Sequence, residues 1–210
     1  MSFMNTHNDL KEIEAYLLKK YDCHTIILYG SYSRGDYTEE SDVDLICFSD
    51  SVIEDTNEVE FIEGKQLDAW IYPTEKMKQS EPFLRVHKGE IWINKKGLAE
   101  EFLANIQRTF EKGTKPLSQD EKNFLKSWLK KMHVRSAKND LEGNYRFHWM
   151  LRDSLEIYFE LKSEWFLGPK VSFQWLKEND PNAFDLFNRA LSTDSKGKSS
   201  KELIDYLCEL

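Results

Sequence analysis

The stretch from Thr25 to Phe48 reads TIILYGSYSRGDYTEESDVDLICF, and it decides the fold of the first half of the chain. Thr25 to Tyr29 is a short apolar run rich in β-type residues, which is typical of a buried strand. Gly30 ends this run, and the polar stretch from Ser31 to Glu40 predicts a loop with room for one helical turn. Asp42 to Phe48 predicts a second strand.

More β-type runs follow, and the pattern then becomes helical. Val59 to Ile62 and Gln66 to Tyr72 flank a tight polar connection that contains Gly64, which predicts a hairpin. Glu90 to Asn94 predicts another strand, and from Leu98 onward the apolar spacing is helical almost to the end. Strands in the first half and helices in the second indicate an α+β protein.

Helices are expected on either side of these strands. From apolar periodicity, capping residues and stop signals they are Asn8 to Tyr21, Thr74 to Gln79, a long helix with a capping box at Ser118 and Glu121, Tyr145 to Phe166, and one that opens at Asp180-Pro181. Gly168-Pro169 is read as the stop signal of the helix before it. A soft boundary at Gly113 divides an N-terminal α+β half, residues 1–113, from a C-terminal helical half, residues 114–210.

Composition narrows the class of protein. The chain has 210 residues, of which 40% are hydrophobic and 31% charged, a balance typical of globular proteins. No stretch approaches 18 apolar residues, so we expect no membrane span, and Met1 to Asn8 lack the apolar core of a secretion signal. The net charge of -8 argues against binding to long nucleic acids, whose affinity for proteins depends on neutralised phosphates.

Cysteine usage points to a reducing environment. Cys23, Cys47 and Cys208 are an odd number without the short spacings of metal sites. The sequence therefore predicts neither a disulfide framework nor a zinc site. A cytoplasmic setting fits best.

The loop after the first strand has the composition of a phosphate site. Gly30 lets the backbone turn sharply and lets a ligand approach closely. Ser31 follows with a hydroxyl and a backbone amide at the start of a helical turn, and Arg34 adds a charge-assisted contact to phosphates. Because side chains alternate along a strand, Asp42 and Asp44 point the same way. Two carboxylates beyond a phosphate loop form a site for hard cations such as Mg²⁺.

Asp68 is the third candidate carboxylate. It lies within the otherwise apolar run from Gln66 to Tyr72, where an unpaired carboxylate is costly. If this strand lies beside the Asp42 to Phe48 strand, three carboxylates come together. At about 4 Å they repel by roughly 4 kcal/mol per pair at an effective dielectric near 20. Such a cluster makes sense with two metal ions, which activate the attacking hydroxyl and neutralise the leaving pyrophosphate.

These residues resemble the signature of the DNA polymerase β-like nucleotidyltransferase superfamily. Gly30-Ser31, a spacer of ten residues, Asp42-Val43-Asp44 and a later Asp68 match its pattern, and Arg34-Gly35 is similar to the small bacterial members. The resemblance implies a nucleotidyltransferase fold, a mixed β-sheet with flanking helices, as the catalytic domain in 1–113. The helical half resembles, in layout, the substrate-binding domain of aminoglycoside and lincosamide nucleotidyltransferases, which implies that role for 114–210.

The resemblance also implies an activity. It is Mg²⁺-dependent transfer of a nucleoside monophosphate from ATP or another nucleoside triphosphate to a hydroxyl of a small-molecule acceptor, with release of pyrophosphate. Two Mg²⁺ ions are expected, with Mn²⁺ as a substitute. The implied catalytic and metal-binding residues are Asp42, Asp44 and Asp68, and the implied nucleotide-binding residues are Gly30, Ser31, Arg34 and Lys170. Asp68 is the first candidate for the general base, before Glu142 and Glu156.

Two alternative functions and the oligomeric state stay open at this point. The same chemistry can act on a protein acceptor. The chain can instead be a retired transferase that binds a protein partner or serves as an antitoxin, although a retired relative is expected to lose a carboxylate. The sequence does not distinguish a monomer from a homodimer.

Overall fold

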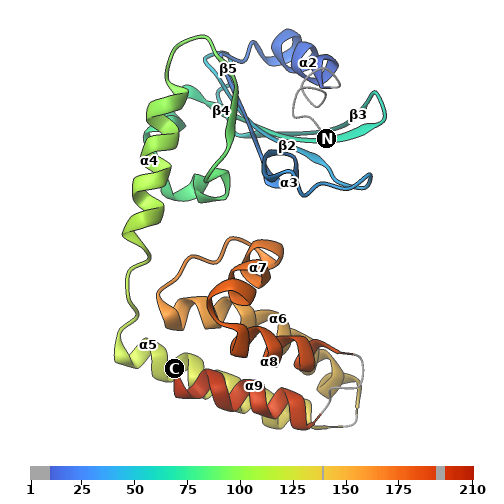
Figure 1. Cartoon of the computed structure of the whole chain (residues 1–210), viewed down its shortest axis with the longest axis vertical. Coiled ribbons are helices and arrows are strands. Elements are labelled where there is room, and N and C mark those ends of the chain that lie inside the picture. The colour runs from blue at the N-terminus through green and yellow to red at the C-terminus, as the bar shows by residue number, and fades with distance from the viewer. Residues whose placement is uncertain (1–9, 139, 193–196) are drawn as a thin grey trace. The chain divides into compact units, whose positions relative to one another are not determined.

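The computed structural model describes residues 10–138, 140–192 and 197–210, and Figure 1 shows their arrangement. The chain divides into two compact units, Met1–Lys112 and Gly113–Leu210. The prediction that Met1 to Asn8 carry no secretion signal lies outside the described residues. Among the residues that the structure describes, none of the helices combines the length and apolar character that crossing a bilayer requires.

The first unit is built on a five-stranded sheet of order β3-β4-β2-β1-β5. The strands are β1 (Thr25–Tyr29), β2 (Val43–Ser49), β3 (Thr56–Ile62), β4 (Lys65–Pro73) and β5 (Glu90–Asn94). β2 and β4 are parallel, whereas the other neighbouring pairs are antiparallel. The sheet is therefore mixed, which confirms the predicted fold class. The β3–β4 hairpin was expected, but β3 begins at Thr56 rather than Val59.

Helices cover the sheet because strand alternation gives it two apolar faces. They are α2 (Lys11–Tyr21), α3 (Gly30–Arg34), the 3₁₀ turns η1 (Thr74–Lys78) and η2 (Glu81–Val86), and α4 (Ala99–Lys112). On one face, Ile13 and Leu17 of α2 pack in a buried core with Leu45 and Cys47 of β2. On the other, the buried ring of Phe48 lies 5.8 Å from that of Phe83 and 5.0 Å from that of Phe102, measured between centroids.

The described residues of the second unit form helices and the loops that join them, with no strand among them. It contains α5 (Gln119–Ser136), α6 (Leu141–Lys162), α7 (Pro169–Asn179), α8 (Pro181–Leu191) and α9 (Lys198–Glu209). The capping box of Ser118 and Glu121 at the start of α5 is confirmed. Asp180 joins three helices, because it caps α8 and accepts hydrogen bonds of 2.7 and 2.8 Å from the hydroxyls of Tyr158 and Tyr206.

The predicted end of the long second helix of this unit is wrong. α6 ends at Lys162 rather than Phe166, because Ser163 adopts a left-handed conformation (φ 58°) and its amide closes the last turn. Gly168 and Pro169 open the next helix instead of closing this one. Proline is favoured in the first turn of a helix, where its missing amide hydrogen is not needed.

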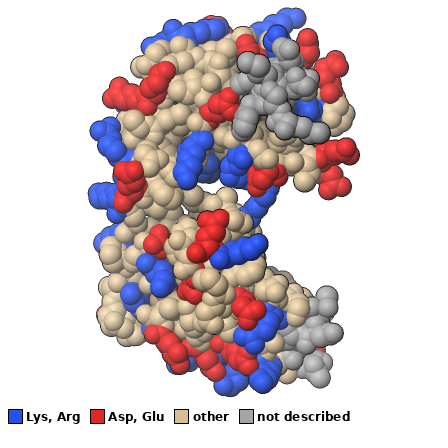
Figure 2. Space-filling view, viewed as in Figure 1, with Lys and Arg blue, Asp and Glu red and all other residues tan. Residues whose placement is uncertain are grey.

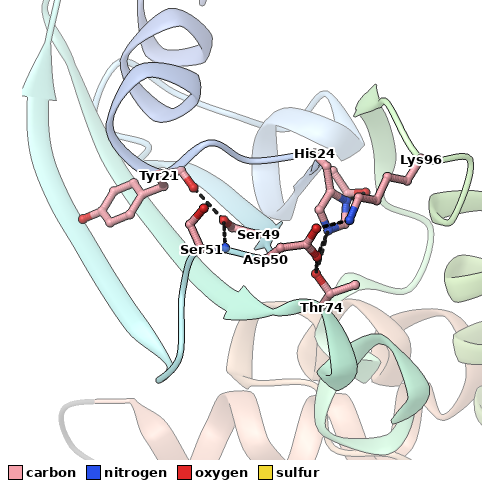
Figure 3. A network of polar contacts seen from close by, with 8 residues as sticks. Tyr21, His24, Ser49, Asp50, Ser51, Thr74 and Lys96 are labelled. Atoms are coloured by element: carbon pink, nitrogen blue, oxygen red, sulfur yellow. Dashed lines mark hydrogen bonds and ion pairs between the residues drawn. The ribbon is translucent and has the colours of Figure 1, made fainter.

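A polar network ties four segments together at the end of the sheet where β2 finishes (Figure 3). His24, only 6% exposed, lies 2.8 Å through Nε2 from the Thr74 hydroxyl and 2.9 Å through Nδ1 from that of Thr25. The Thr74 hydroxyl donates to Asp50 at 2.5 Å, and Asp50 also pairs with Lys96. Because Thr74 uses its proton on Asp50, it accepts from Nε2–H of His24. Burial, followed by the charge of Lys96, lowers the pKa of His24 and favours this neutral ring.

We predict that Thr74→Val lowers the free energy of unfolding by about 1–3 kcal/mol, because it leaves Nε2–H of a buried imidazole without an acceptor. The isosteric control is Thr114→Val, at a half-buried position outside the sheet, which we expect to change stability by no more than about 0.5 kcal/mol. Urea unfolding at pH 7.5 measures both. Equal midpoints for the two variants would contradict the role given to this network.

Candidate active site

Gly30 leaves no room for a side chain beside Asp44. Gly30 opens α3 directly after β1 and has a left-handed backbone with φ +72°. A Cβ built on Gly30 would lie 2.0 Å from Oδ2 of Asp44. Glycine is therefore required twice, for the backbone conformation and for the space that the carboxylate occupies. The single turn expected between Ser31 and Glu40 is α3 itself, and Ser31 is buried within it.

The sheet places Asp68 beside Asp44. The two residues are register partners on the parallel strands β2 and β4, so their side chains leave the same face of the sheet. Asp44 is also the register partner of Tyr29 on β1. Asp42 lies two positions earlier, just outside the first residue of β2, rather than within the strand as predicted. Neighbouring strands therefore bring together carboxylates that are 24 positions apart, from Asp44 to Asp68.

The surroundings of Asp44 disfavour the charged form of its carboxylate. Burial, followed by the charges of Asp68 and Asp42, raises the pKa of Asp44 to about 6. Arg34 and Arg85 oppose that rise. The repulsion expected from three neighbouring carboxylates is thus present at Asp44, while two guanidinium groups lie close enough to offset part of it.

Asp68 is oriented by a residue that the sequence did not point to. Nδ2 of Asn57, on β3, donates to Oδ1 of Asp68 at 2.7 Å. Asn57 is not the direct register partner of Asp68, which is Val59. Only the pairing of β3 with β4 brings this amide to the carboxylate, so no local motif could have identified it.

Arg85 is a second residue that sequence analysis missed. It lies in η2, and its guanidinium is 5.8 Å from the ring centroid of Tyr29 and 5.7 Å from that of Trp70. Its Nη2 donates to the hydroxyl of Tyr72 at 2.9 Å. Aromatic contacts of this kind hold a cation in place, and its effect on the pKa of Asp44 puts it beside the carboxylates. Arg85 stands outside any periodic pattern or motif, so its sequence gives no signal.

The remaining predicted residues lie on other elements than the carboxylates. Arg34 forms an exposed ion pair of 3.4 Å with Asp36, a geometry that leaves it able to turn towards a ligand. Lys170 is an exposed residue of α7 in the second unit. Glu142 pairs with Arg146 at 2.6 Å, and this partner lowers the pKa of Glu142. A low pKa and an ion pair make Glu142 a poor general base.

The donor set suits a hard divalent cation, with one restriction. Within the described ranges, no group of three or more acidic, histidine or cysteine side chains is close enough to hold a metal ion jointly. Mg²⁺ usually takes one or two protein carboxylates and completes its shell with water and substrate phosphates. Asp42 and Asp44 supply two such carboxylates, and burial together with the charges of Asp68 and Asp42 raises the pKa of Asp44.

Comparison with known proteins assigns the family. Residues 10–160 match the family model described as a nucleotidyltransferase domain, which is more than half of the chain. The chain therefore belongs to the nucleotidyltransferase domain family. The resemblance inferred from Gly30-Ser31 and the aspartates is confirmed at this level.

The curated relatives match this chain over shorter regions than the family model does. Two proteins of Methanocaldococcus jannaschii, whose names describe them provisionally as protein adenylyltransferases, are 49% identical over 49 residues and 45% identical over 47 residues. These regions cover 22% and 20% of this chain, and the chain spans about half the length of these curated relatives, 49% and 47%. This chain also aligns with the crystal structure of a nucleotidyltransferase-like protein from Exiguobacterium sibiricum. The alignment covers 97% of this chain and 74% of the other chain, at 12% identity and with a TM-score of 0.42.

We predict that Gly30→Ala weakens Mg²⁺-dependent nucleotide binding at least tenfold, on the order of the loss that misplaced catalytic groups cause, because the new Cβ displaces the Asp44 carboxylate. Calorimetric titration measures the binding, and thermal unfolding measures the stability.

The matched control is Gly97→Ala. Gly97 has nearly the same backbone, φ +67°, but a Cβ added to it would meet nothing within 4 Å. Both substitutions place a side chain in the left-handed region and cost about 1–2 kcal/mol of stability. Only Gly30→Ala is expected to lose binding. Equal binding by the two variants would separate Asp44 from the nucleotide site.

Proposed function

We propose that this nucleotidyltransferase transfers AMP from ATP to a hydroxyl group of an acceptor and depends on Mg²⁺. The observation that carries the proposal is the contact of Asp44 with Gly30, with Asp68 in register beside it. It puts carboxylates directly against the glycine turn that is expected to receive the phosphates. The short relatives named for adenylyl transfer support ATP as the donor.

Each residue has a proposed task. The α3 turn from Gly30 and Ser31 binds the triphosphate, with Arg34 and Arg85 offering charge-assisted hydrogen bonds to its oxygens. Asp42 and Asp44 hold Mg²⁺, which when bound offsets negative charge on the phosphates. We propose that Lys170 contributes a further contact to the phosphates.

The proposed reaction is a single displacement at the α-phosphorus. The acceptor oxygen forms a bond to that phosphorus, and the bond from it to the oxygen shared with the β-phosphate breaks, so pyrophosphate leaves. The proton of the acceptor hydroxyl passes to a carboxylate. We assign this role to Asp68, because the amide of Asn57 fixes one of its oxygens and leaves the other to receive the proton.

For the acceptor we propose a small molecule, with residues 114–210 as the domain that binds it. Lys and Arg are interspersed with Asp and Glu over the face shown in Figure 2, in keeping with an acceptor other than a long nucleic acid. The free thiols of Cys23, Cys47 and Cys208 support a cytoplasmic setting. A monomer and a homodimer are both compatible with the proposal.

A protein acceptor is the second candidate. The names of the two Methanocaldococcus jannaschii proteins favour it, although the matched regions cover only about a fifth of this chain, 22% and 20%. Label from the α-phosphate of ATP would appear on a polypeptide for a protein acceptor and on a small compound otherwise.

We predict that the full-length protein binds α,β-methylene-ATP in the presence of Mg²⁺ and at least about tenfold more weakly without it, because phosphate charge is otherwise unopposed beside the carboxylates. Isothermal titration calorimetry measures both affinities. The double variant Asp42→Asn/Asp44→Asn should lose the dependence on Mg²⁺.

The control is Asp55→Asn/Asp120→Asn, which removes two charges from residues outside the cluster. It should bind as the unsubstituted protein does. No binding of the four common triphosphates, or Mg²⁺-dependent binding retained by Asp42→Asn/Asp44→Asn, would overturn the proposal.

A further inference from the structure

A groove on the second unit has no part in the proposed chemistry. It lies between α5 and α6 and has a volume of about 270 Å³. Phe124 and Trp128 of α5 and Ile157 of α6 form its apolar walls. Phe124 is 68% exposed although it is large and apolar, and the ring centroid of Trp128 lies 5.9 Å from that of Trp149 in an edge-to-face contact. The groove thus presents aromatic surface to solvent.

Three carboxylates of α6 also line this groove. They are Asp153, Glu156 and Glu160, which share one side of the helix because they are spaced three and four residues apart. Asp153 is held by Nε1–H of Trp149 at 2.6 Å and by a loose ion pair of 3.7 Å with Arg152. For Glu156 and Glu160, the part of the chain that the structure describes supplies no cationic partner within ion-pair distance.

The groove therefore concentrates negative charge next to aromatic rings. Burial, followed by the charge of Glu156, raises the pKa of Glu160, which shows that the two carboxylates repel each other. An aromatic face and a carboxylate attract the same kind of ligand, an organic cation, through cation–π and ionic contacts.

We propose that the groove between α5 and α6 binds a small organic ammonium ion, with its apolar part against Phe124 and Trp128 and its charge at Glu156 and Glu160. A small molecule fits better than a protein partner, because a volume of about 270 Å³ is near the lower end for small-ligand pockets. A stable protein interface needs about 1,200–2,000 Å² of buried surface. The residues that line the groove all belong to the second unit.

The test is calorimetric titration of the full-length protein with 2-phenylethylammonium chloride. We expect saturable binding, at least about tenfold weaker binding of the neutral analogue 2-phenylethanol, and at least about fivefold weaker ammonium binding by Glu156→Gln/Glu160→Gln. Phe124→Ala should weaken binding of the ammonium ion as well, because it removes the exposed aromatic wall. Both variants change exposed side chains, so the fold should persist, which circular dichroism checks.

The matched control is Glu142→Gln/Glu178→Gln, which removes the same charge from the same unit outside the groove. It should bind the ammonium ion as the unsubstituted protein does. Absence of saturable binding, equal binding of 2-phenylethanol, or equal weakening in the control would overturn the proposal. So would a short lysine-containing peptide that binds more than tenfold tighter, because the groove would then be a docking surface for a protein. Nucleotide binding measured on the same samples reports separately on the donor site.

Discussion

The carboxylate of Asp44 occupies the space that a side chain at position 30 would fill, and the arrangement of the site depends on this contact. A Cβ at Gly30 would meet Oδ2 of Asp44 at 2.0 Å, so the turn after β1 can approach β2 only because glycine stands there. The register of β1 with β2 and of β2 with β4 then fixes the other members. Tyr29 lies on one side of Asp44 and Asp68 on the other.

This packing has a cost in the absence of ligand. The pKa of Asp44 in the folded protein, about 6, is above its ordinary value, so the folded state binds the proton more tightly than the unfolded state. The stability that protonated Asp44 contributes is full at acid pH and is lost as the pH rises through about 6. At neutral pH Asp44 is therefore mostly ionised, and the folded protein is less stable than it would be with this carboxyl protonated. A bound cation would offset part of that cost, and perturbed pKa values of this kind cluster at functional sites.

Much of the site could be predicted from sequence because its signals are local. Strand periodicity alone predicts the apolar run before Gly30. It also predicts that Asp44 and Asp68 point to the opposite face from their neighbours Leu45 and Ala69. Asn57 and Arg85 could not be predicted, because they reach the site through strand pairing and through a 3₁₀ turn without a sequence pattern.

Two boundaries of predicted elements differ from the structure for the same physical reason. Helix α6 ends at Lys162 because Ser163 turns left-handed, which serine rarely does, so the Gly-Pro pair further on was the stronger signal. Asp42 has the spacing of a strand residue, but pairing of β2 begins only at Val43. In both cases the contacts of the folded chain, rather than local propensity, set the boundary.

We infer that a bound cation offsets the charge of Asp44, a carboxylate crowded by Asp42 and Asp68. Carbon-detected NMR titration of the aspartate side chains, with Asp44→Asn to assign the resonance, tests it most directly. We expect a pKa of about 6 for Asp44 in the protein alone, and we expect this pKa to fall clearly when Mg²⁺ and α,β-methylene-ATP are added. An ordinary aspartate pKa that does not respond to either addition would contradict it.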